Sequence, residues 1–410
     1  MPCGARFVSQ ARVFTCWRYG HRQRRRCQSP AGSRQRSGRA AGNCRWPPLR
    51  CQERRSQPEY LCRSGCRGRR LTANSFWSAR VYRLETIAED FFFIQFTNVA
   101  WPASANILLI VDPDGLNLVD AGHNGGETAI VLEKCLDGLG FGLSDIHSIY
   151  LTHGHNDHVG GVNFVKRFAS PRVFIPPGSI AEATDPKAQE NAVLPDFVRT
   201  IAPRLEHYDI LDNFRRSCGD WVLDGDALKP LADGDEVAIG RYRFCLHHTP
   251  GHDAGLTVFH EPDRKILVTA DLLRASPPGN SLPWYSSTGG GVAPYLDSLE
   301  RVAGLEVEQA FPSHGALKGD FAAHVEKTRG FLISREERIL QELSLGPQTC
   351  EQLDVLLYSP LALEICPWYS SITEAHLAYL IDRGQVVRRE LEYCLVESAP
   401  RALQQGAADD

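Results

Sequence analysis

The sequence predicts a layered α/β protein with β-sheet at its centre. Three observations lead to this fold class. From about residue 81, short apolar runs that look like strands alternate with turn residues, helical patterns lie between these runs, and after residue 319 the pattern becomes mainly helical. Strands that alternate with helices are typical of a layered α/β domain. We therefore expect four regions: an extension over 1–75, an α/β domain over 76–319, a small domain over 320–400 and a tail over 401–410.

Residues 1–75 differ in composition from the rest of the chain. They hold 18 Arg, no Lys and two acidic residues, a net charge of +16, which leaves the remainder at −20. The segment lacks helical or strand periodicity and cannot bury a core, so we expect it to be disordered, like the tail. Three interpretations stay open: a transit peptide for mitochondria, a basic arm that contacts nucleic acid, or sequence outside the functional product.

Cysteine usage and hydropathy bear on the compartment. The six cysteines beyond residue 75 are dispersed, mostly in apolar surroundings, which indicates free thiols in a reducing compartment. The longest apolar runs, 91–96 and 107–111, are far shorter than the roughly 18 residues of a membrane-spanning helix. The sequence predicts a cytoplasmic protein with no membrane segment, and a mitochondrial location is the alternative if residues 1–75 act as a transit peptide.

Strands and helices follow from the apolar spacing. Helices are predicted over 126–138 and 159–168. Strands are predicted over 91–96, 106–111, 116–119, 148–151, 172–175, 242–246, 256–260 and 265–269.

A motif with metal-binding chemistry begins where the strand over 148–151 ends. The next residues read Thr-His-Gly-His-Asn-Asp-His and place His153, His155, Asp157 and His158 on one turn. Imidazole and carboxylate groups are ligands that Zn²⁺ accepts. Two His separated by one residue can converge on one ion, and the Asp-His pair a turn further on can address a second. A chance match to His-x-His-x-Asp-His is rare, so the motif predicts a metal site.

Further ligands are expected from later strand ends. His252 follows the predicted strand over 242–246, Asp271 ends the apolar run that starts at residue 265, and His314 lies in Pro-Ser-His-Gly. Each residue alone is more often structural than functional. Their occurrence together, in this order after the first motif, indicates a site for two metal ions.

With these motifs, residues from about 81 to 319 resemble the metallo-β-lactamase superfamily. The resemblance implies a four-layer αββα sandwich that holds two metal ions. It implies seven ligands: His153, His155 and His252 on the first metal, Asp157, His158 and His314 on the second, and Asp271 bridging both. Asp120, in Val-Asp-Ala-Gly, matches an early Asp of the family that orients ligand His side chains, although a simple turn Asp is the alternative.

Three residues depart from the pattern of the superfamily. Ala270 and Ser313 replace the Gly that usually precedes the bridging Asp and the last His, and both changes are small enough to keep the ligands. Asp253 stands after His252 where Ser or Thr is common, and it could change the surroundings of the ligands. We expect structural roles for three other His near the motifs, which are His123, His247 and His248.

The expected cofactor is two Zn²⁺ per chain, and Fe or Mn would fit the same ligands. Two cations that share a water lower its pKa towards 7 and give a bridging hydroxide that attacks a carbonyl or phosphorus. Asp157 is the candidate for handling the proton. Two irregular stretches, 180–226 (with a predicted helix over 206–216) and 276–291, could select the substrate or pad the surface. Their aromatic residues include Phe197, Tyr208, Phe214, Trp221, Trp284 and Tyr285.

The region after residue 319 is predicted to contain helices over 334–344, 350–357 and 372–383, followed by a hairpin over 386–388 and 393–396. Thr349 is the expected N-cap of the second helix, and Gly384 ends the third. This pattern resembles the winged-helix domain of the β-lactamase-like protein 2 type branch, whose members include thioester hydrolases and endoribonucleases. Residues 321–410 carry eight basic and 14 acidic residues, which disfavours nucleic acid. We expect instead a structural domain or one that forms a homodimer contact.

The function that these features favour is hydrolysis of a small ester or thioester, such as an acyl-CoA, acyl-carrier or glutathione conjugate. The alternatives are a single-stranded RNA endoribonuclease, a lactone or β-lactam hydrolase, and a non-catalytic scaffold. The charge of −20 beyond residue 75 argues against an RNA groove. The expected partner is a small-molecule substrate.

Overall fold

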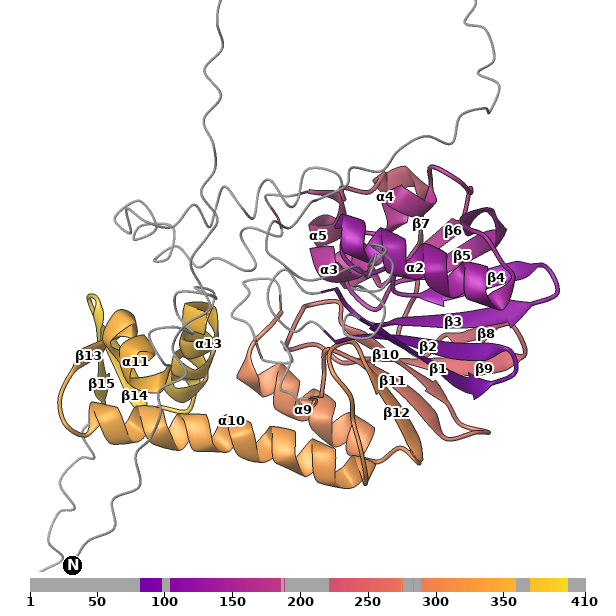
Figure 1. Ribbon diagram of the computed structural model, residues 1–410. Coiled ribbons are helices and arrows are strands. Elements are labelled where there is room, and N and C mark those ends of the chain that lie inside the picture. Colours follow the sequence, from indigo (N-terminus) through magenta and orange to yellow (C-terminus); the bar gives the residue numbers. More distant parts are fainter. Residues whose placement is uncertain are drawn as a thin grey trace, which may run out of the picture. The chain divides into compact units, whose positions relative to one another are not determined.

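Two β-sheets lie at the centre of the described part of the chain (Figure 1). The structure is a computed structural model that describes residues 82–97, 104–185, 188, 221–273, 275, 283, 289–358 and 369–396. The chain divides into two units, Met1–Gly68 and Arg69–Asp410, and every described residue belongs to the second. The predicted extension over 1–75, helix over 206–216 and tail over 401–410 lie outside the described residues.

The first sheet has seven strands in sequence order. Its first four strands are antiparallel, and the last four run parallel to one another. They are β1 (Tyr82–Ala88), β2 (Phe91–Phe96), β3 (Ile107–Asp112), β4 (Gly115–Val119), β5 (Ile146–Tyr150), β6 (Arg172–Ile175) and β7 (Leu228–Pro230).

The second sheet has five strands in the order β12-β11-β10-β9-β8. All neighbours are antiparallel except β11 and β12, which run parallel because helix α9 (Val292–Ala303) connects them. The strands are β8 (Glu236–Ile239), β9 (Tyr242–His248), β10 (Thr257–Glu261), β11 (Ile266–Ala270) and β12 (Gln309–Pro312).

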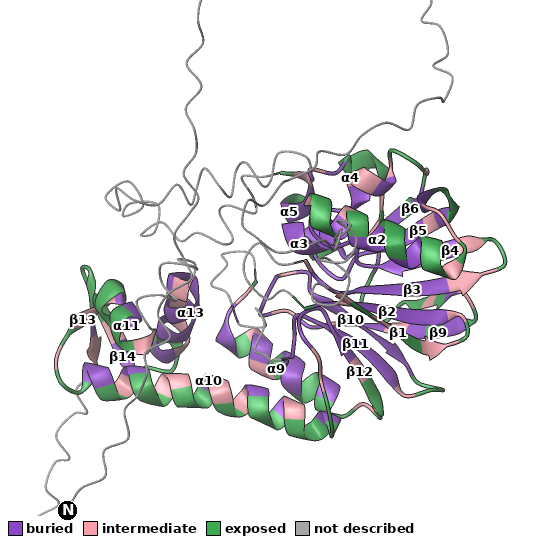
Figure 2. Ribbon diagram, viewed as in Figure 1, coloured by how far each residue is buried: buried purple, intermediate pink, exposed green. Residues whose placement is uncertain are grey.

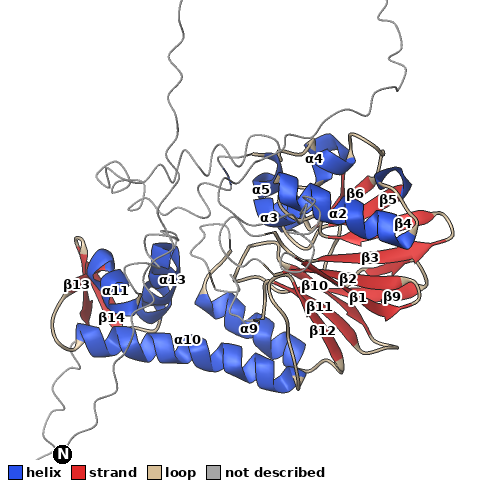
Figure 3. Ribbon diagram, in the orientation of Figure 1, coloured by secondary structure: helices blue, strands red, loops and turns tan. Residues whose placement is uncertain are grey.

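The two sheets face each other across a shared apolar core. Phe91 and Phe93 of β2 belong to one cluster with Phe244 of β9. Because side chains alternate along a strand, Phe92 and Ile94 point the other way and join a second cluster with helix α2 (Gly126–Leu139). A third cluster joins the second sheet to α9. The layers are therefore helix, sheet, sheet and helix, and the predicted αββα fold is confirmed (Figures 2 and 3).

The helix predicted over 159–168 is wrong. Two short helices, α3 (Asn156–Val159) and α4 (Val162–Val165), occupy this stretch. Between them the backbone packs closely on the loop after β4: a Cβ on Gly160 would lie 2.4 Å from Asn124 N, and one on Gly161 would lie 2.0 Å from Ala121 O. These two glycines interrupt the helix and bring the metal-binding motif against β4.

Several elements have no counterpart among the predicted ones. They are β1, β7, β8, β12, α5 (Ile180–Thr184), α9 and the short helices η1 (Leu143–Asp145), η2 (Pro177–Ser179) and η3 (Gly225–Ala227). Most are short, and β1 alternates exposed and half-buried residues, so its apolar signal is weak. The predicted bounds of β2 and β6 match the observed ones, and those of the other predicted strands differ by at most two residues at an end.

The C-terminal elements form a small module with its own apolar cluster. The helix predicted over 334–344 is too short, because α10 spans Phe321–Leu343 and begins at Asp320, whose carboxylate accepts hydrogen bonds from Ala322 N and Ala323 N. The other elements are β13 (Gln348–Thr349), α11 (Cys350–Leu357), α13 (Tyr369–Asp382), β14 (Val386–Arg389) and β15 (Glu392–Leu395). The predicted hairpin is present as β14 and β15. The winged-helix assignment and the four domain boundaries stay predictions.

The N-terminus of α11 carries the predicted Thr cap. Thr349 Oγ1 accepts a hydrogen bond from Gln352 N at 3.3 Å, and Thr349 N donates to Gln352 Oε1 at 2.8 Å. We expect Thr349→Ala to destabilise this module by about 1 kcal/mol, because an N–H group of the first turn loses its acceptor. Amide hydrogen exchange in α11 measures the effect, with Thr349→Ser, which keeps the oxygen, as the control. Equal exchange in the two variants would contradict the capping role.

The helices of the described residues differ from membrane-spanning helices. Among these residues, no helix has both the length and the apolar character needed to cross a bilayer.

Candidate metal centre

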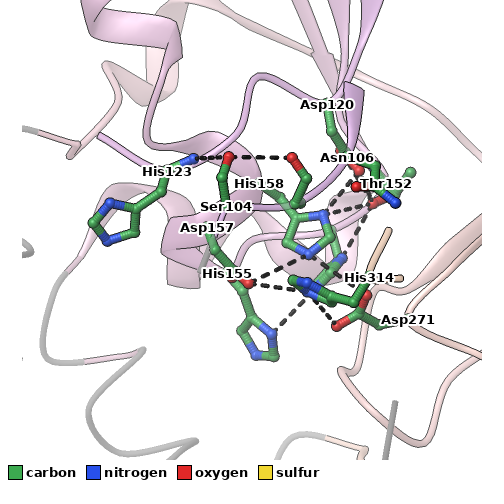
Figure 4. A network of polar contacts seen from close by, with 12 residues as sticks. Ser104, Asn106, Asp120, His123, Thr152, His155, Asp157, His158, Asp271 and His314 are labelled. Carbon is green, nitrogen blue, oxygen red and sulfur yellow. Dashed lines mark hydrogen bonds and ion pairs between the residues drawn. The ribbon is translucent and has the colours of Figure 1, made fainter. Parts of the chain in front are cut away.

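The seven predicted ligands lie at strand ends on one edge of the two sheets. Figure 4 shows four of them, Asp157, His158, Asp271 and His314, pointing toward one another. The first four ligands in the chain follow β5, and the others follow β9, β11 and β12. All seven side chains are buried. Residues that are up to 161 positions apart in the chain therefore meet at one place, which neither sheet could build alone. The seven are His153, His155, Asp157, His158, His252, Asp271 and His314.

Three imidazoles make a first group. His155 Nδ1 lies 2.9 Å from His153 Nε2 and 3.1 Å from His252 Nε2, so three ring nitrogens surround one point. Burial, and then the neighbouring His158, keeps the pKa of His153 well below its ordinary value. Burial, and then His252, lowers the pKa of His155 to about 4. At neutral pH both rings are uncharged and offer lone pairs, the form in which His binds a metal.

A second group joins Asp157, His158 and His314. Asp157 Oδ2 lies 3.1 Å from His314 Nε2 and 3.9 Å from His158 Nε2. Burial alone would lower the pKa of His314, but the Asp271 and Asp157 carboxylates outweigh it and raise that pKa to about 10. Burial is likewise outweighed at His158, where the carboxylates of Asp120 and Asp157 raise the pKa well above its ordinary value. Positive charge is thus favoured at this second position.

Asp271 lies between the two groups. Its Oδ2 is 3.3 Å from His252 Nε2 and 3.4 Å from His314 Nε2, and its Oδ1 is 3.7 Å from His158 Nε2. Burial would raise the pKa of this carboxyl, but His314 and His158 lower it well below the usual range. A buried carboxylate that contacts both groups is placed to bridge two cations.

The donor set fits divalent transition metals. Imidazole nitrogens and carboxylate oxygens are Zn²⁺ ligands, and their ligand atoms lie within 4.8 Å of one another in each group. Among the described residues, His158 Nε2, His314 Nε2 and Asp271 Oδ1 have no hydrogen-bond partner although they are buried. Buried polar atoms need partners, and cations at these two positions would supply them.

Asp120 lies where the resemblance predicts an orienting carboxylate. Its Oδ2 accepts a hydrogen bond from His158 Nδ1 at 2.8 Å, and its Oδ1 accepts one from Thr152 N at 2.9 Å. Because Nδ1 donates to Asp120, the neutral form of the His158 ring carries its lone pair on Nε2, which faces Asp157 and Asp271. Asp120 has a φ of 61°, a left-handed conformation that Asp tolerates better than most residues.

Asn106 fixes the loop that carries His314, a role that the sequence did not reveal. Its Nδ2 donates to Pro312 O at 2.8 Å and to Gly315 O at 3.0 Å, and its Oδ1 accepts from Phe96 N at 2.9 Å. The only signal was a polar residue at the start of an otherwise apolar predicted strand.

Replacing Asn106 with Ala is expected to lower the free energy of unfolding by about 3 kcal/mol, because two carbonyls and one N–H in a buried place lose their partners. Urea denaturation measures this loss. Asn106→Asp keeps the acceptor but removes both donors, so it should be similarly destabilised. Wild-type stability in both variants would show that the loop is held in another way.

Tyr295 of α9 connects two of the ligand loops. A Cβ on Gly251, which has a φ of 133°, would lie 2.5 Å from Tyr295 Cα, so the loop before His252 packs directly on α9. The Tyr295 hydroxyl donates to Leu272 O, next to Asp271. In addition, Gly291 N at the start of α9 donates to Gly251 O at 2.9 Å.

Other residues that the sequence singled out lie outside the ligand groups. Within the described residues, no group of candidate ligand atoms includes His123, His247 or His248. Trp221, one of the aromatic residues considered for substrate selection, is fully buried in the core with α2, so that assignment is wrong. The remaining five aromatics of the two irregular stretches lie outside the described residues.

Glu182 of α5 was not predicted to belong to the site. Its Oε2 lies 3.5 Å from His155 Nε2, and Asp253 is its neighbour in a group of three with His155. Burial, and then the Asp253 carboxylate, raises the pKa of Glu182 to about 10. Asp253, which stands where the superfamily commonly has Ser or Thr, therefore places a second carboxyl group beside the predicted ligand His155. A single Glu in an irregular stretch gave no signal in the sequence.

Comparisons with known proteins agree with this geometry. The family model described as the metallo-beta-lactamase superfamily matches residues 100–314. The probable metallo-hydrolase YqjP of Bacillus subtilis is 27% identical over 270 residues, 62% of this chain and 81% of that protein. A hydroxyacylglutathione hydrolase of Cereibacter sphaeroides is 28% identical, over 53% of this chain and 68% of its own length. An atrochrysone carboxyl ACP thioesterase of Aspergillus fumigatus is 23% identical, over 55% of this chain and 41% of its own length.

A solved structure shows the same fold. The crystal structure of a metallo-beta-lactamase family protein from Thermus thermophilus aligns with a TM-score of 0.59 at 24% identity, covering 71% of this chain and 94% of that one.

Proposed function

Because the chain belongs to the metallo-β-lactamase superfamily, we propose that it is a two-metal hydrolase that acts on a small thioester. The observation that carries the proposal is the convergence of five imidazoles and two carboxylates in two adjoining groups. His153, His155 and His252 would hold the first cation. The second would be held by Asp157, His158 and His314, with Asp271 shared. Zn²⁺ is the proposed ion at both positions, and Fe or Mn would suit the same donors.

When bound, two such cations lower the pKa of water towards 7 and polarise a carbonyl oxygen. The chain itself supplies orientation and a route for the proton. Asp157 Oδ2 contacts His314 Nε2 at 3.1 Å, which fixes the carboxylate at the second position. Burial raises the pKa of Asp157, but His158 and His314 lower it by a larger amount, so this carboxylate is ionised. In this form it would accept a proton from attacking water. Its second role would be to return that proton to the leaving thiolate.

The thioester substrate class is supported by relatives and by charge. Two similar proteins are named for acyl groups carried on glutathione and on an acyl carrier protein. Endoribonuclease activity is disfavoured because the chain beyond residue 75 carries a net charge of −20, and binding to RNA phosphates relies on Lys and Arg.

The test is a substrate panel with purified protein. Acyl-CoA, acyl-pantetheine and acylglutathione thioesters are compared with a lactone, a β-lactam and single-stranded RNA. Release of the free thiol monitors thioester hydrolysis. We expect its kcat/KM to be at least about tenfold higher than that of any other reaction in the panel, a difference of about 1.4 kcal/mol in activation free energy. Preferential cleavage of RNA or of the lactone would replace the proposal, and no turnover of any member would favour a scaffold.

The pKa values of His158 and His314 predict how metal affinity depends on pH. Both are raised above the ordinary value of about 6.5, so in the metal-free protein both rings are protonated at pH 7. A cation can bind only when these protons leave. Affinity at the second position should therefore rise with pH, by up to about a hundredfold per unit while two protons are released, and fall on acidification. Chelator competition between pH 6.5 and 8.5 measures it, and a flat profile would contradict the prediction.

A further inference from the structure

Glu182 and Asp253 lie against the first ligand group without belonging to it. Their exposed fractions are 5% and 2%. Within the described residues, neither Glu182 Oε2 nor Asp253 Oδ2 has a hydrogen-bond partner. Glu182 Oε2 is, however, in ion-pair range of His155 Nε2, at 3.5 Å. Buried carboxyl oxygens without partners are costly to keep, which points to a role for this pair beside His155.

The ring of His155 defines what Glu182 can do. Its Nδ1 faces His153 and His252, so this nitrogen is the one placed to bind a cation. A ligand nitrogen must be unprotonated, and a neutral imidazole then carries its hydrogen on the other nitrogen. In His155 that nitrogen is Nε2, which faces Glu182 Oε2. A carboxyl oxygen at 3.5 Å from this nitrogen is placed to accept its hydrogen, which would fix both the tautomer and the rotation of the ring.

Close backbone contacts hold Glu182 in place. A Cβ on Gly154 would lie 2.6 Å from Ser179 O and 3.0 Å from Glu182 Cβ, so the turn between the two ligand His packs directly on the start of α5. Asp253 Oδ1 accepts hydrogen bonds from Ser179 Oγ at 2.8 Å and from Gly255 N at 2.7 Å. The residue after His252 is thus tied to the same segment that presents Glu182.

We propose that Glu182 is a positioning residue that holds His155 in the orientation needed to bind the first cation, and that Asp253 anchors it. The inference rests on the ligand role proposed above for His155. This role explains why Asp253 stands where the superfamily commonly has Ser or Thr. The two oxygens of an Asp can approach Ser179 and Glu182 separately, whereas Ser or Thr has a single side-chain oxygen. Through Ser179, this arrangement joins α5 to the loops that carry His155 and His252.

The test compares Glu182→Leu with Glu182→Gln, because the two side chains are similar in size and only Gln keeps an oxygen for the Nε2 hydrogen. Metal-free full-length protein is titrated with Co²⁺, the visible absorption bands report the geometry of the first site, and chelator competition gives the Kd. We expect Leu to raise the Kd of the first cation about 10- to 100-fold with altered bands, and Gln to stay within about threefold of wild type. If Leu does not yield folded protein, Glu182→Asp, which withdraws the carboxyl by one methylene, carries the same expectation.

His155→Ala separates the two layers of the hypothesis. If it leaves Co²⁺ binding unchanged, the proposed metal site is itself wrong. If it abolishes the first site while Glu182→Leu binds like wild type, only the positioning role is lost. Equal weakening in Leu and Gln, together with a lower Tm of both metal-free proteins, would mean that Glu182 is merely structural. Loss of a whole metal equivalent in both would make the acids ligands, which also overturns the inference.

Discussion

Replacing Asp271 with Ala should reduce turnover by at least about a thousandfold and leave the protein folded. Asp271 contacts both ligand groups, at 3.3 Å from His252 Nε2 and 3.4 Å from His314 Nε2. Without it, each of the two proposed cations would lose a carboxylate ligand. The loss should appear in kcat, because the substrate does not need this group for binding.

Steady-state kinetics on the best thioester measures this effect, with circular dichroism and metal analysis to verify folding and metal content. Asp263→Ala is the matched control, because Asp263 is an exposed Asp in the turn between β10 and β11. The control should keep wild-type kcat and metal content. Activity of Asp271→Ala within about tenfold of wild type would show that the bridging position is misassigned.

Removal of metal is expected to have an effect of similar size on activity and a large one on stability. Purified protein should contain close to two transition-metal ions per chain, and dialysis against a chelator should abolish turnover. The predicted ligands come from both sheets, so bound metal would add to the backbone hydrogen bonds that already join their segments, such as Thr257 N to Thr152 O at 3.0 Å. At a free metal concentration of a thousand times Kd, each ion would stabilise the folded state by about 4 kcal/mol.

Elemental analysis, steady-state kinetics and urea denaturation before and after chelation measure the metal content, the turnover and the stability. Adding back Zn²⁺, Mn²⁺ or Fe²⁺ separately shows which ion restores activity, and Mg²⁺ is the control because it prefers oxygen ligands. Full activity in a metal-free preparation would refute the two-metal mechanism. A stoichiometry near one would reduce the site to a single cation.

The central sheets could be predicted because their strands are short apolar runs between turns. β2 and β6 occur over the same residues as predicted, and β3, β4, β5, β9, β10 and β11 are displaced by only one or two residues. β1 and β8 were missed because their exposed residues dilute the apolar pattern. The interruption between α3 and α4 could not be foreseen, because Gly160 and Gly161 matter only through their contacts with the loop after β4.

The convergence of the ligands was predictable because metal chemistry restricts residue type and spacing. His-x-His-x-Asp-His marks its own turn, the later residues follow apolar runs or lie in a short motif, and the resemblance assigned them to the two metals. Residues that position the ligands have no such restriction. Asn106 acts through Pro312 O and Gly315 O, some 206 and 209 positions away, and Glu182 acts through a ring nitrogen of His155. Such contacts depend on the folded backbone, which a single sequence does not specify.

The contacts of Tyr295 have a consequence for protein engineering. The connection between β11 and α9 starts beside Asp271 and ends at Gly291, and both ends are fastened, one by the Tyr295 hydroxyl and one by the bond from Gly291 N to Gly251 O. Because both anchors lie outside residues 276–288, we expect exchanges within that range to leave the positions of His252 and Asp271 unchanged. Grafting this stretch from a relative would therefore test whether it selects the acyl group of the proposed thioester substrate.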